Sequence, residues 1–159
     1  MSPHSREQLD AWMSRALEVA REALTSGDVP VGALVISPDG DVVGEGYNTR
    51  ERDRSPVGHA EINALTAAAQ TLDDNRLDGC TLVVTLEPCV MCAGSIGQAG
   101  ISTLVYGAED EKAGAAGGGP HDLVRDRSLP HRVDEVIGGV KAAECSALLV
   151  DFFKTLRDQ

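Results

Sequence analysis

The chain has 159 residues, a formal net charge of −11 at pH 7, and a composition that is 42% hydrophobic and 25% charged. This length is typical of one domain with its own core, so we expect residues 1–159 to fold as a single domain without disulfide bonds. The balance of apolar and charged residues excludes a disordered or fibrous protein. The acidic total disfavours non-specific attraction to a nucleic-acid backbone.

The sequence also predicts a cytoplasmic protein. No apolar run reaches the ~20 residues that a membrane-spanning helix requires, and the polar residues 1–10 lack the apolar stretch of a signal peptide. In the reducing cytosol, clustered cysteines indicate metal or redox chemistry rather than disulfide bonds. The four cysteines are Cys80, Cys89, Cys92 and Cys145.

In chain order, the first predicted element is an amphipathic helix over Ser5–Ser26, because its apolar residues recur with a period near 3.6. Two β-rich runs follow, Val31–Ile36 and Val42–Tyr47. Residues 37–40 between them read Ser-Pro-Asp-Gly, which is typical of a turn. We therefore expect a β-hairpin after the first helix.

The remaining elements alternate between helices and short apolar strands. This alternation after an opening hairpin predicts an α/β domain with a mixed sheet. The expected elements are a loop over 48–58, a helix over 59–70, strands over 81–85 and 101–106 with a helix over 90–99 between them, a loop over 107–119, a weak strand over 135–140 and a terminal helix over 142–156.

Two short motifs carry the chemistry: His59-Ala60-Glu61, and a Pro-Cys-Val-Met-Cys segment that contains Cys89 and Cys92. One imidazole and two thiolates are ligands suited to zinc, and three protein ligands leave the fourth tetrahedral position open for water, as in catalytic sites. Each motif begins a predicted helix, where the helix dipole favours thiolates. We expect two helix N-termini to meet at one ion.

Glu61 lies next to a ligand without being needed as one. A zinc ion lowers the pKa of its bound water toward ~7, and a neighbouring carboxylate can carry the proton from that water to the substrate and leaving group. Glu61 is therefore the predicted catalytic acid and base.

Two other readings of the cysteines stay open. The spacing of Cys89 and Cys92 also fits a redox pair, and Cys80 could be the fourth ligand of a structural zinc site. Cys80 and Cys145 otherwise fit buried apolar thiols.

The two motifs match the zinc nucleobase-deaminase signature. The chain closely resembles the bacterial tRNA adenosine deaminases, and the similarity runs from about Gly27 to Phe153. The segments that carry it are 29–33, 44–48, 59–62, 85–94 (Thr-Leu-Glu-Pro-Cys-Val-Met-Cys-Ala-Gly), 112–117, 144–145 and 151–153.

The resemblance implies a three-layer α/β/α, cytidine-deaminase-like fold with a mixed five-stranded sheet. It implies a homodimer with one zinc ion per subunit, held by His59, Cys89 and Cys92, with Glu61 as the proton shuttle. It also implies a substrate: the wobble adenosine of a tRNA anticodon stem-loop, converted to inosine with release of ammonia.

The same resemblance implies a set of substrate contacts. Asn48 would hydrogen-bond the purine, Val31 and Leu86 would line the base pocket, and the Ala60 backbone would contact the base. Residues matching positions near the anticodon loop are Asp110, Lys112 and Phe153. The alternatives are that Val31, Leu86 and Phe153 only pack in the core and that Asn48 only forms a turn.

The sequence departs from the family pattern at three places: Ser55–Gly58, Glu109, and the weakly basic C-terminal residues 154–158. None of these departures alters the zinc motifs. They are also compatible with a metabolic deaminase of a free base or nucleoside, of the guanine or cytosine type. A third candidate is a non-catalytic, zinc-stabilised subunit that helps to bind RNA. The intact Glu61 argues against it.

Overall fold

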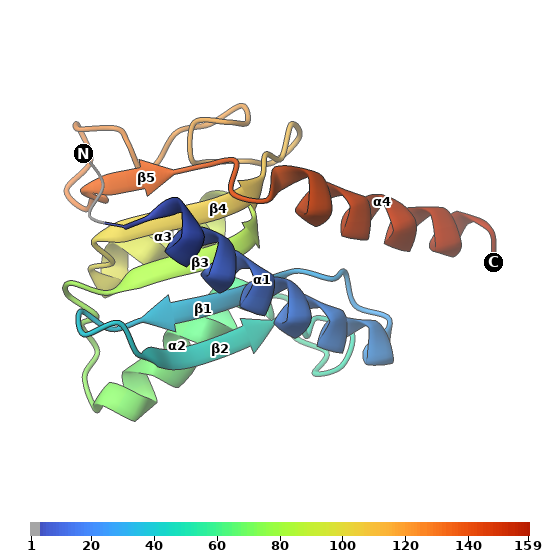
Figure 1. The fold of residues 1–159 in the computed structure, drawn as a ribbon, viewed down its shortest axis with the longest axis horizontal. Helices are drawn as coiled ribbons and strands as arrows, with labels where there is room; N and C mark the ends of the chain where they lie inside the picture. Colours follow the sequence, from blue (N-terminus) through green and yellow to red (C-terminus); the bar gives the residue numbers. More distant parts are fainter. Residues whose placement is uncertain (1–3) are drawn as a thin grey trace.

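A computed structural model describes residues 4–159 and contains a five-stranded sheet with the strand order β2-β1-β3-β4-β5 (Figure 1). β1 pairs with β2 and with β3 in antiparallel orientation, whereas β3–β4 and β4–β5 are parallel. The predicted mixed sheet is therefore confirmed. The strands are β1 (Gly32–Ile36), β2 (Val42–Tyr47), β3 (Thr81–Leu86), β4 (Thr103–Ala108) and β5 (Glu135–Ile137).

Four α-helices cover both faces of the sheet, which makes the fold the expected three-layer α/β/α sandwich (Figure 1). α2 and α3 pack on one face, over a core that includes Val35, Leu82 and Ile96. α1 and α4 lie on the other face, over a core that includes Met13 and Leu34. The helices are α1 (Arg6–Glu22), α2 (Ala60–Leu72), α3 (Val90–Ala99) and α4 (Ala142–Arg157).

The opening hairpin forms as predicted. The Gly40 amide donates to the Ser37 carbonyl at 2.9 Å, and the Ser37 amide donates to Asp41 at 2.8 Å, which closes the turn between β1 and β2. The predicted first helix differs in its last turn: the α-helix ends at Glu22, and residues Ala23–Ser26 form a short 3-10 helix, η1.

The strand expected at 101–106 lies two residues further along, at Thr103–Ala108. The Ile101 amide still bonds to Ile96 in α3, and the Ser102 amide bonds to Cys80, so neither residue joins the ladder. At the other end, Ala108 pairs with Leu86 in the parallel ladder, which extends β4 into the segment expected to be a loop. The shift matters because it brings the end of β4 beside the end of β3.

α2 approaches β2 closely enough to fix where its first residues lie. A Cβ on Gly46 would meet the Ala60 carbonyl oxygen at 2.6 Å, so only glycine lets the helix start this near the strand. The Asn63 side chain then donates to the Tyr47 carbonyl at 2.8 Å and to Thr49 Oγ1 at 2.9 Å. These contacts hold the beginning of α2 against the end of β2.

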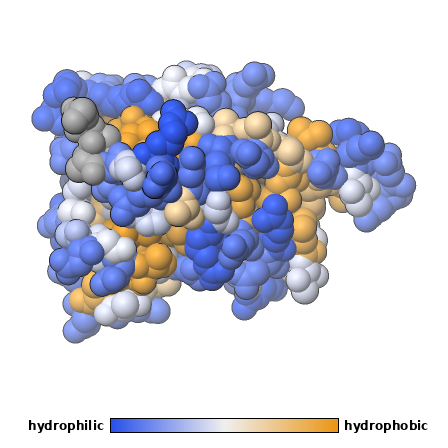
Figure 2. All heavy atoms as spheres, viewed as in Figure 1, coloured by the Kyte–Doolittle hydropathy of each residue, from blue (hydrophilic) through white to orange (hydrophobic). Residues whose placement is uncertain are grey.

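α4 projects beyond the sheet, at the end where β3 and β4 finish (Figure 1). Figure 2 shows that the face bearing α1 is mostly hydrophilic, with apolar side chains gathered between α1 and the base of α4. Phe153 and Leu156 on α4 are 42% and 52% exposed. Within residues 4–159, no helix has both the length and the apolar character needed to cross a membrane.

Candidate metal centre

His59 and Cys89 occupy equivalent places: each is the residue immediately before a helix, α2 and α3 respectively. Both have extended backbone conformations, with φ of −82° and −78°, so their side chains lie off the helix ends. Cys92 lies one turn into α3 and faces the same point, fully buried. The predicted meeting of two helix N-termini is present.

The three ligand atoms are close enough to share one ion. His59 Nδ1 lies 3.6 Å from Cys89 Sγ and 3.4 Å from Cys92 Sγ, and all three atoms lie within 4.8 Å of one another. A tetrahedral zinc ion with ordinary Zn–N and Zn–S bond lengths separates nitrogen from sulfur by about 3.6 Å. The donor set and its spacing therefore fit zinc without movement of the backbone.

The two thiols differ in their acidity. Hydrogen bonds from Cys92 and His59 lower the pKa of Cys89 to about 3. The hydrogen bond to Cys89, together with burial, raises the pKa of Cys92. A zinc ion held by both sulfurs requires both as thiolates, so metal binding releases protons from these thiols.

Glu61 lies at the second position of α2 and is 4% exposed. Burial raises the pKa of Glu61 to about 7, which is the range suited to a group that both accepts and returns a proton at neutral pH. A cation on the neighbouring ligands would lower that pKa, because it favours the carboxylate.

A cavity of about 550 Å³ opens onto His59, Glu61 and Cys89. Lys112 does not line it: the side chain is exposed, and its backbone amide donates to Asp110 Oδ1 at 3.0 Å. The substrate contacts predicted from sequence that do line the cavity are Val31, Asn48, Ala60, Leu86, Asp110 and Phe153. Their roles in binding stay predictions.

The structure separates the remaining cysteines from this site. Among residues 4–159 the metal-ligand group comprises His59 and two cysteines, and Cys80 is not part of it. Cys80 is buried at the start of β3, and burial raises its pKa. Burial also raises the pKa of Cys145, to about 11. All four thiols are free.

Asp28 is a residue of the cavity that sequence reasoning missed. It is 2% exposed, and its carboxylate accepts the backbone amides of Glu51 at 2.6 Å and Arg52 at 3.1 Å and the Ser26 hydroxyl at 2.5 Å. Although burial raises the pKa of Asp28, these hydrogen bonds keep it below its ordinary value. Asp28 therefore holds the charged loop 49–58 at the cavity mouth.

The arginines of that loop are not equivalent. Arg52 pairs with Asp53 at 3.4 Å, and Arg54 pairs with Glu51 at 3.8 Å. Arg50 lines the cavity and takes part in none of the ion pairs found within residues 4–159. Arg50 is thus the loop cation left to face a ligand.

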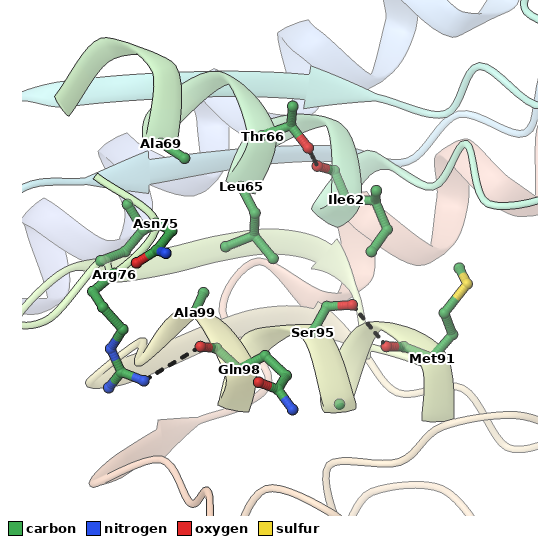
Figure 3. A pocket seen from close by; sticks show the side chains of 12 residues that line it. Ile62, Leu65, Thr66, Ala69, Asn75, Arg76, Met91, Ser95, Gln98 and Ala99 are labelled. Atoms are coloured by element: carbon green, nitrogen blue, oxygen red, sulfur yellow. Dashed lines mark hydrogen bonds between the residues drawn. The ribbon is translucent and has the colours of Figure 1, made fainter. Parts of the chain in front are cut away.

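A second cavity, of about 800 Å³, lies between α2 and α3 and contains none of the metal ligands (Figure 3). Ile62 and Leu65 of α2 point toward Met91 and Ser95 of α3 across it (Figure 3). It is larger than the cavity at the metal centre but has no cluster of reactive groups, so we assign the chemistry to the smaller cavity.

Fold and site together define a zinc-binding enzyme with three protein ligands and a buried carboxylate beside them. The chain belongs to the cytidine and deoxycytidylate deaminase family, whose zinc-binding region it matches over residues 6–108. The match includes all three metal ligands and Glu61.

Two relatives have names that are more specific than the name of the family. A tRNA-specific adenosine deaminase from Streptococcus pyogenes is 37% identical over 157 residues, which is 99% of this chain and 97% of that protein. The chain also aligns with 28% of a longer Deinococcus deserti protein named tRNA(Ile)-lysidine synthase, at 46% identity over 95% of this chain.

Two solved structures have folds similar to that of this chain. One, from a study of A-to-I editing by tRNA:A34 deaminases at the wobble position, has a TM-score of 0.79 and 37% identity, covering 87% of this chain and 99% of the other. Another, a guanine deaminase from Nitrosomonas europaea, has a TM-score of 0.76 and 28% identity, covering 90% and 83%.

Replacing Cys89 with alanine removes one of the three zinc ligands. We expect Cys89→Ala to lose the zinc ion and some stability, because metal binding contributes to folding. Metal analysis of the purified protein measures this, and Cys80→Ala is the matched control because Cys80 is an equally free thiol outside the ligand group. A Cys89→Ala protein that still binds one zinc per chain would contradict the assignment.

Proposed function

We propose that this protein is a zinc-dependent hydrolytic deaminase that converts the wobble adenosine of a tRNA anticodon to inosine and releases ammonia. The observation that carries the proposal is the metal-ligand trio with buried Glu61 beside it, next to a 550 Å³ cavity that His59, Glu61 and Cys89 line. The full-length similarity to a tRNA-specific adenosine deaminase supports the choice of substrate. The cavity falls in the usual size range for small-ligand sites, so one extruded base can enter it.

The residues at the metal centre have distinct roles in the proposed reaction. His59, Cys89 and Cys92 would hold the zinc ion, which supplies a water molecule of lowered pKa. Glu61 would carry one proton from that water to the purine ring nitrogen, and it would then carry the second proton, from the hydroxyl group now on C6, to the departing amino group. The new C–O bond forms at C6 of adenine, the C6–N6 bond breaks, and one water is consumed for each ammonia released.

The cavity walls supply recognition of the base. Asn48 is buried, and its Oδ1 accepts the Arg50 amide at 3.2 Å, which leaves its Nδ2 group to donate to an acceptor on the purine. Val31 and Leu86 provide apolar surface against the ring faces, and the Ala60 backbone borders the base. Val31 also packs in the core, so the part of the cavity wall that it forms is rigid.

Contacts to the phosphate groups of the RNA come from cationic side chains at the cavity mouth, although the net charge of the protein is negative. Arg50 lines the cavity and is not in an ion pair, and Lys112 is exposed on the neighbouring loop. Phe153 lines the cavity while remaining 42% exposed, so an unpaired base can stack on its ring. These few groups are enough to position an anticodon loop against an otherwise acidic protein.

The second candidate is a deaminase of a free base such as guanine. The similarity to the Nitrosomonas europaea guanine deaminase favours it, as does the net charge of −11. The two candidates share the metal centre and differ in what surrounds the base.

Glu61→Gln should keep the fold and the zinc ion and lose turnover, because glutamine cannot carry the proton. We expect the rate of deamination to fall by roughly 100-fold or more. The measurement is ammonia or inosine release, with zinc content as the control for an intact site. Undiminished turnover in a zinc-loaded variant would contradict the role of Glu61.

The substrate class can be decided by a panel: an anticodon stem-loop with a wobble adenosine, free adenosine, guanine and cytosine. We expect deamination of the stem-loop only. Raising the salt from about 50 to 200 mM should lower kcat/KM on the stem-loop by roughly tenfold if two phosphates are contacted. Turnover of guanine that does not respond to salt would support the second candidate instead.

We further propose that the protein acts in the cytoplasm as a homodimer that pairs through the α2–α3 face. The cavity between these helices is lined by apolar side chains of both helices, including Ile62, Leu65 and Met91, together with polar ones such as Arg76 and Gln98 (Figure 3). Val90 at the start of α3 and Leu72 at the end of α2 are 50% and 40% exposed, which enlarges the apolar surface that a second copy would cover. The free cysteines support a reducing compartment.

Ser95→Arg places a charge in the α2–α3 cavity and should split the dimer. The wild-type protein should sediment at twice the 16.7 kDa of one chain and the variant at that mass. Gln8→Arg, an equal change of charge on α1 of the opposite face, should leave the dimer intact. A wild-type monomer, or a Ser95→Arg dimer, would count against this face.

A further inference from the structure

The loop over residues 110–119 follows β4 and forms one side of the metal-site cavity, through Asp110 and Ala113. Glu87 lies beneath this loop, between the end of β3 and Cys89, and is 2% exposed. Sequence reasoning gave Glu87 no role. We infer that Glu87 is a positioning residue: its buried carboxylate fixes the loop over residues 110–119 as the substrate-facing wall of the cavity. The inference rests on the proposed function for its substrate.

The Glu87 carboxylate accepts hydrogen bonds from four backbone amides of the loop. Its Oε2 accepts the backbone amides of Ala116 at 2.9 Å, Gly118 at 3.1 Å and Gly119 at 2.9 Å. Its Oε1 accepts the amide of Asp110 at 3.0 Å. One side chain therefore binds both ends of the loop, and bonds to a charged acceptor are the stronger class of hydrogen bond.

In the described part of the chain, the hydrogen bonds to the Glu87 carboxylate come from backbone amides rather than from a cationic side chain. None of the ion pairs found within residues 4–159 includes Glu87. Four hydrogen bonds from backbone amides therefore stabilise the carboxylate. A buried carboxylate in this position stays stable only while those amides remain in place, so the carboxylate and the loop conformation depend on each other.

The backbone next to Glu87 strengthens the connection to the metal centre. The Glu87 amide donates to the Ala108 carbonyl, and the Ala115 amide donates to the Pro88 carbonyl, both at 2.8 Å. The Ala115 bond thus attaches the loop to Pro88, directly before the ligand Cys89, and the Ala108 bond attaches the end of β4 to Glu87. Any displacement of the loop moves the cavity wall relative to the metal ligands.

The loop is shaped to lie on the carboxylate. A Cβ on Gly114 would collide with the Glu87 carboxyl group, so only glycine permits the contact. Asp110 organises the other end, where its Oδ1 accepts the amides of Lys112 at 3.0 Å and Ala113 at 3.1 Å. The loop therefore has a fixed conformation that places Asp110 and Ala113 in the cavity.

The test compares Glu87→Gln with Glu111→Gln. Glutamine keeps the size of Glu87 but offers one acceptor oxygen, and its NH₂ group would oppose a loop amide. Glu111→Gln removes the same charge from an exposed position of the same loop, which controls for electrostatic effects on RNA. We expect Glu87→Gln to raise KM for the anticodon stem-loop about tenfold or more while kcat and zinc content change little, and Glu111→Gln to match wild type.

A structural readout accompanies the kinetics. In wild-type protein the amides of residues 110–119 should exchange slowly with deuterium, and in Glu87→Gln they should exchange at least tenfold faster while α2 and α3 stay protected. If Glu87→Gln does not fold, Gly114→Ala perturbs the same contact from the loop side and should give the same KM and exchange changes.

The outcomes are distinct. Unchanged KM and unchanged exchange in folded Glu87→Gln and Gly114→Ala would overturn the inference, as would an equal effect of Glu111→Gln. A loss of kcat at unchanged KM would also overturn it, because that assigns Glu87 to the chemistry. If wild-type protein does not deaminate the stem-loop, the proposed substrate is wrong, and the exchange measurement alone still decides whether Glu87 holds the loop.

Discussion

The site depends on one geometric constraint: two helix N-termini must reach a common point within the length of a metal–ligand bond. β1 and β3 are adjacent, α2 begins against the end of β2, and α3 begins after β3, so the sheet fixes both helix starts relative to each other. His59 Nδ1 and Cys92 Sγ come within 3.4 Å as a result. The backbone therefore sets the distance between the ligand atoms.

The same arrangement separates the ligands from the proton carrier. His59 precedes α2 and faces the ion, whereas Glu61 lies inside the first turn and is buried beside it. Two residues apart on a helix, the side chains point in different directions, so Glu61 borders the ion without joining the ligand group. Burial raises its pKa to about 7, a consequence of the apolar packing of α2 on the sheet. The fold thus places a buried carboxylate directly beside the metal ligands.

The sequence was enough to predict the layers, the hairpin and the metal ligands, since each depends on local patterns: periodicity, turn residues and spacing. The extent of β4 was misjudged because Gly107 reads as a loop residue, whereas its place in the strand is decided by the parallel pairing of Ala108 with Leu86. Asp28 was missed for a related reason. Its partners are backbone amides more than 20 residues away, and backbone amides leave no mark in a sequence.

Asp28 and Glu87 show how the cavity mouth is built from loops and yet has a defined shape. Each is a nearly inaccessible carboxylate that accepts several backbone amides, one from the loop over 49–58 and the other from the loop over 110–119. Amides bonded in this way cannot also bond a ligand, so the loop over 49–58 offers the cavity a side chain, Arg50, beside Phe153 of α4. A wall of this kind can differ between relatives that share the metal centre, because the loop side chains can change while the buried carboxylates hold the backbone. We therefore expect the choice between an anticodon and a free base to depend on the loops at the cavity mouth rather than on the metal ligands.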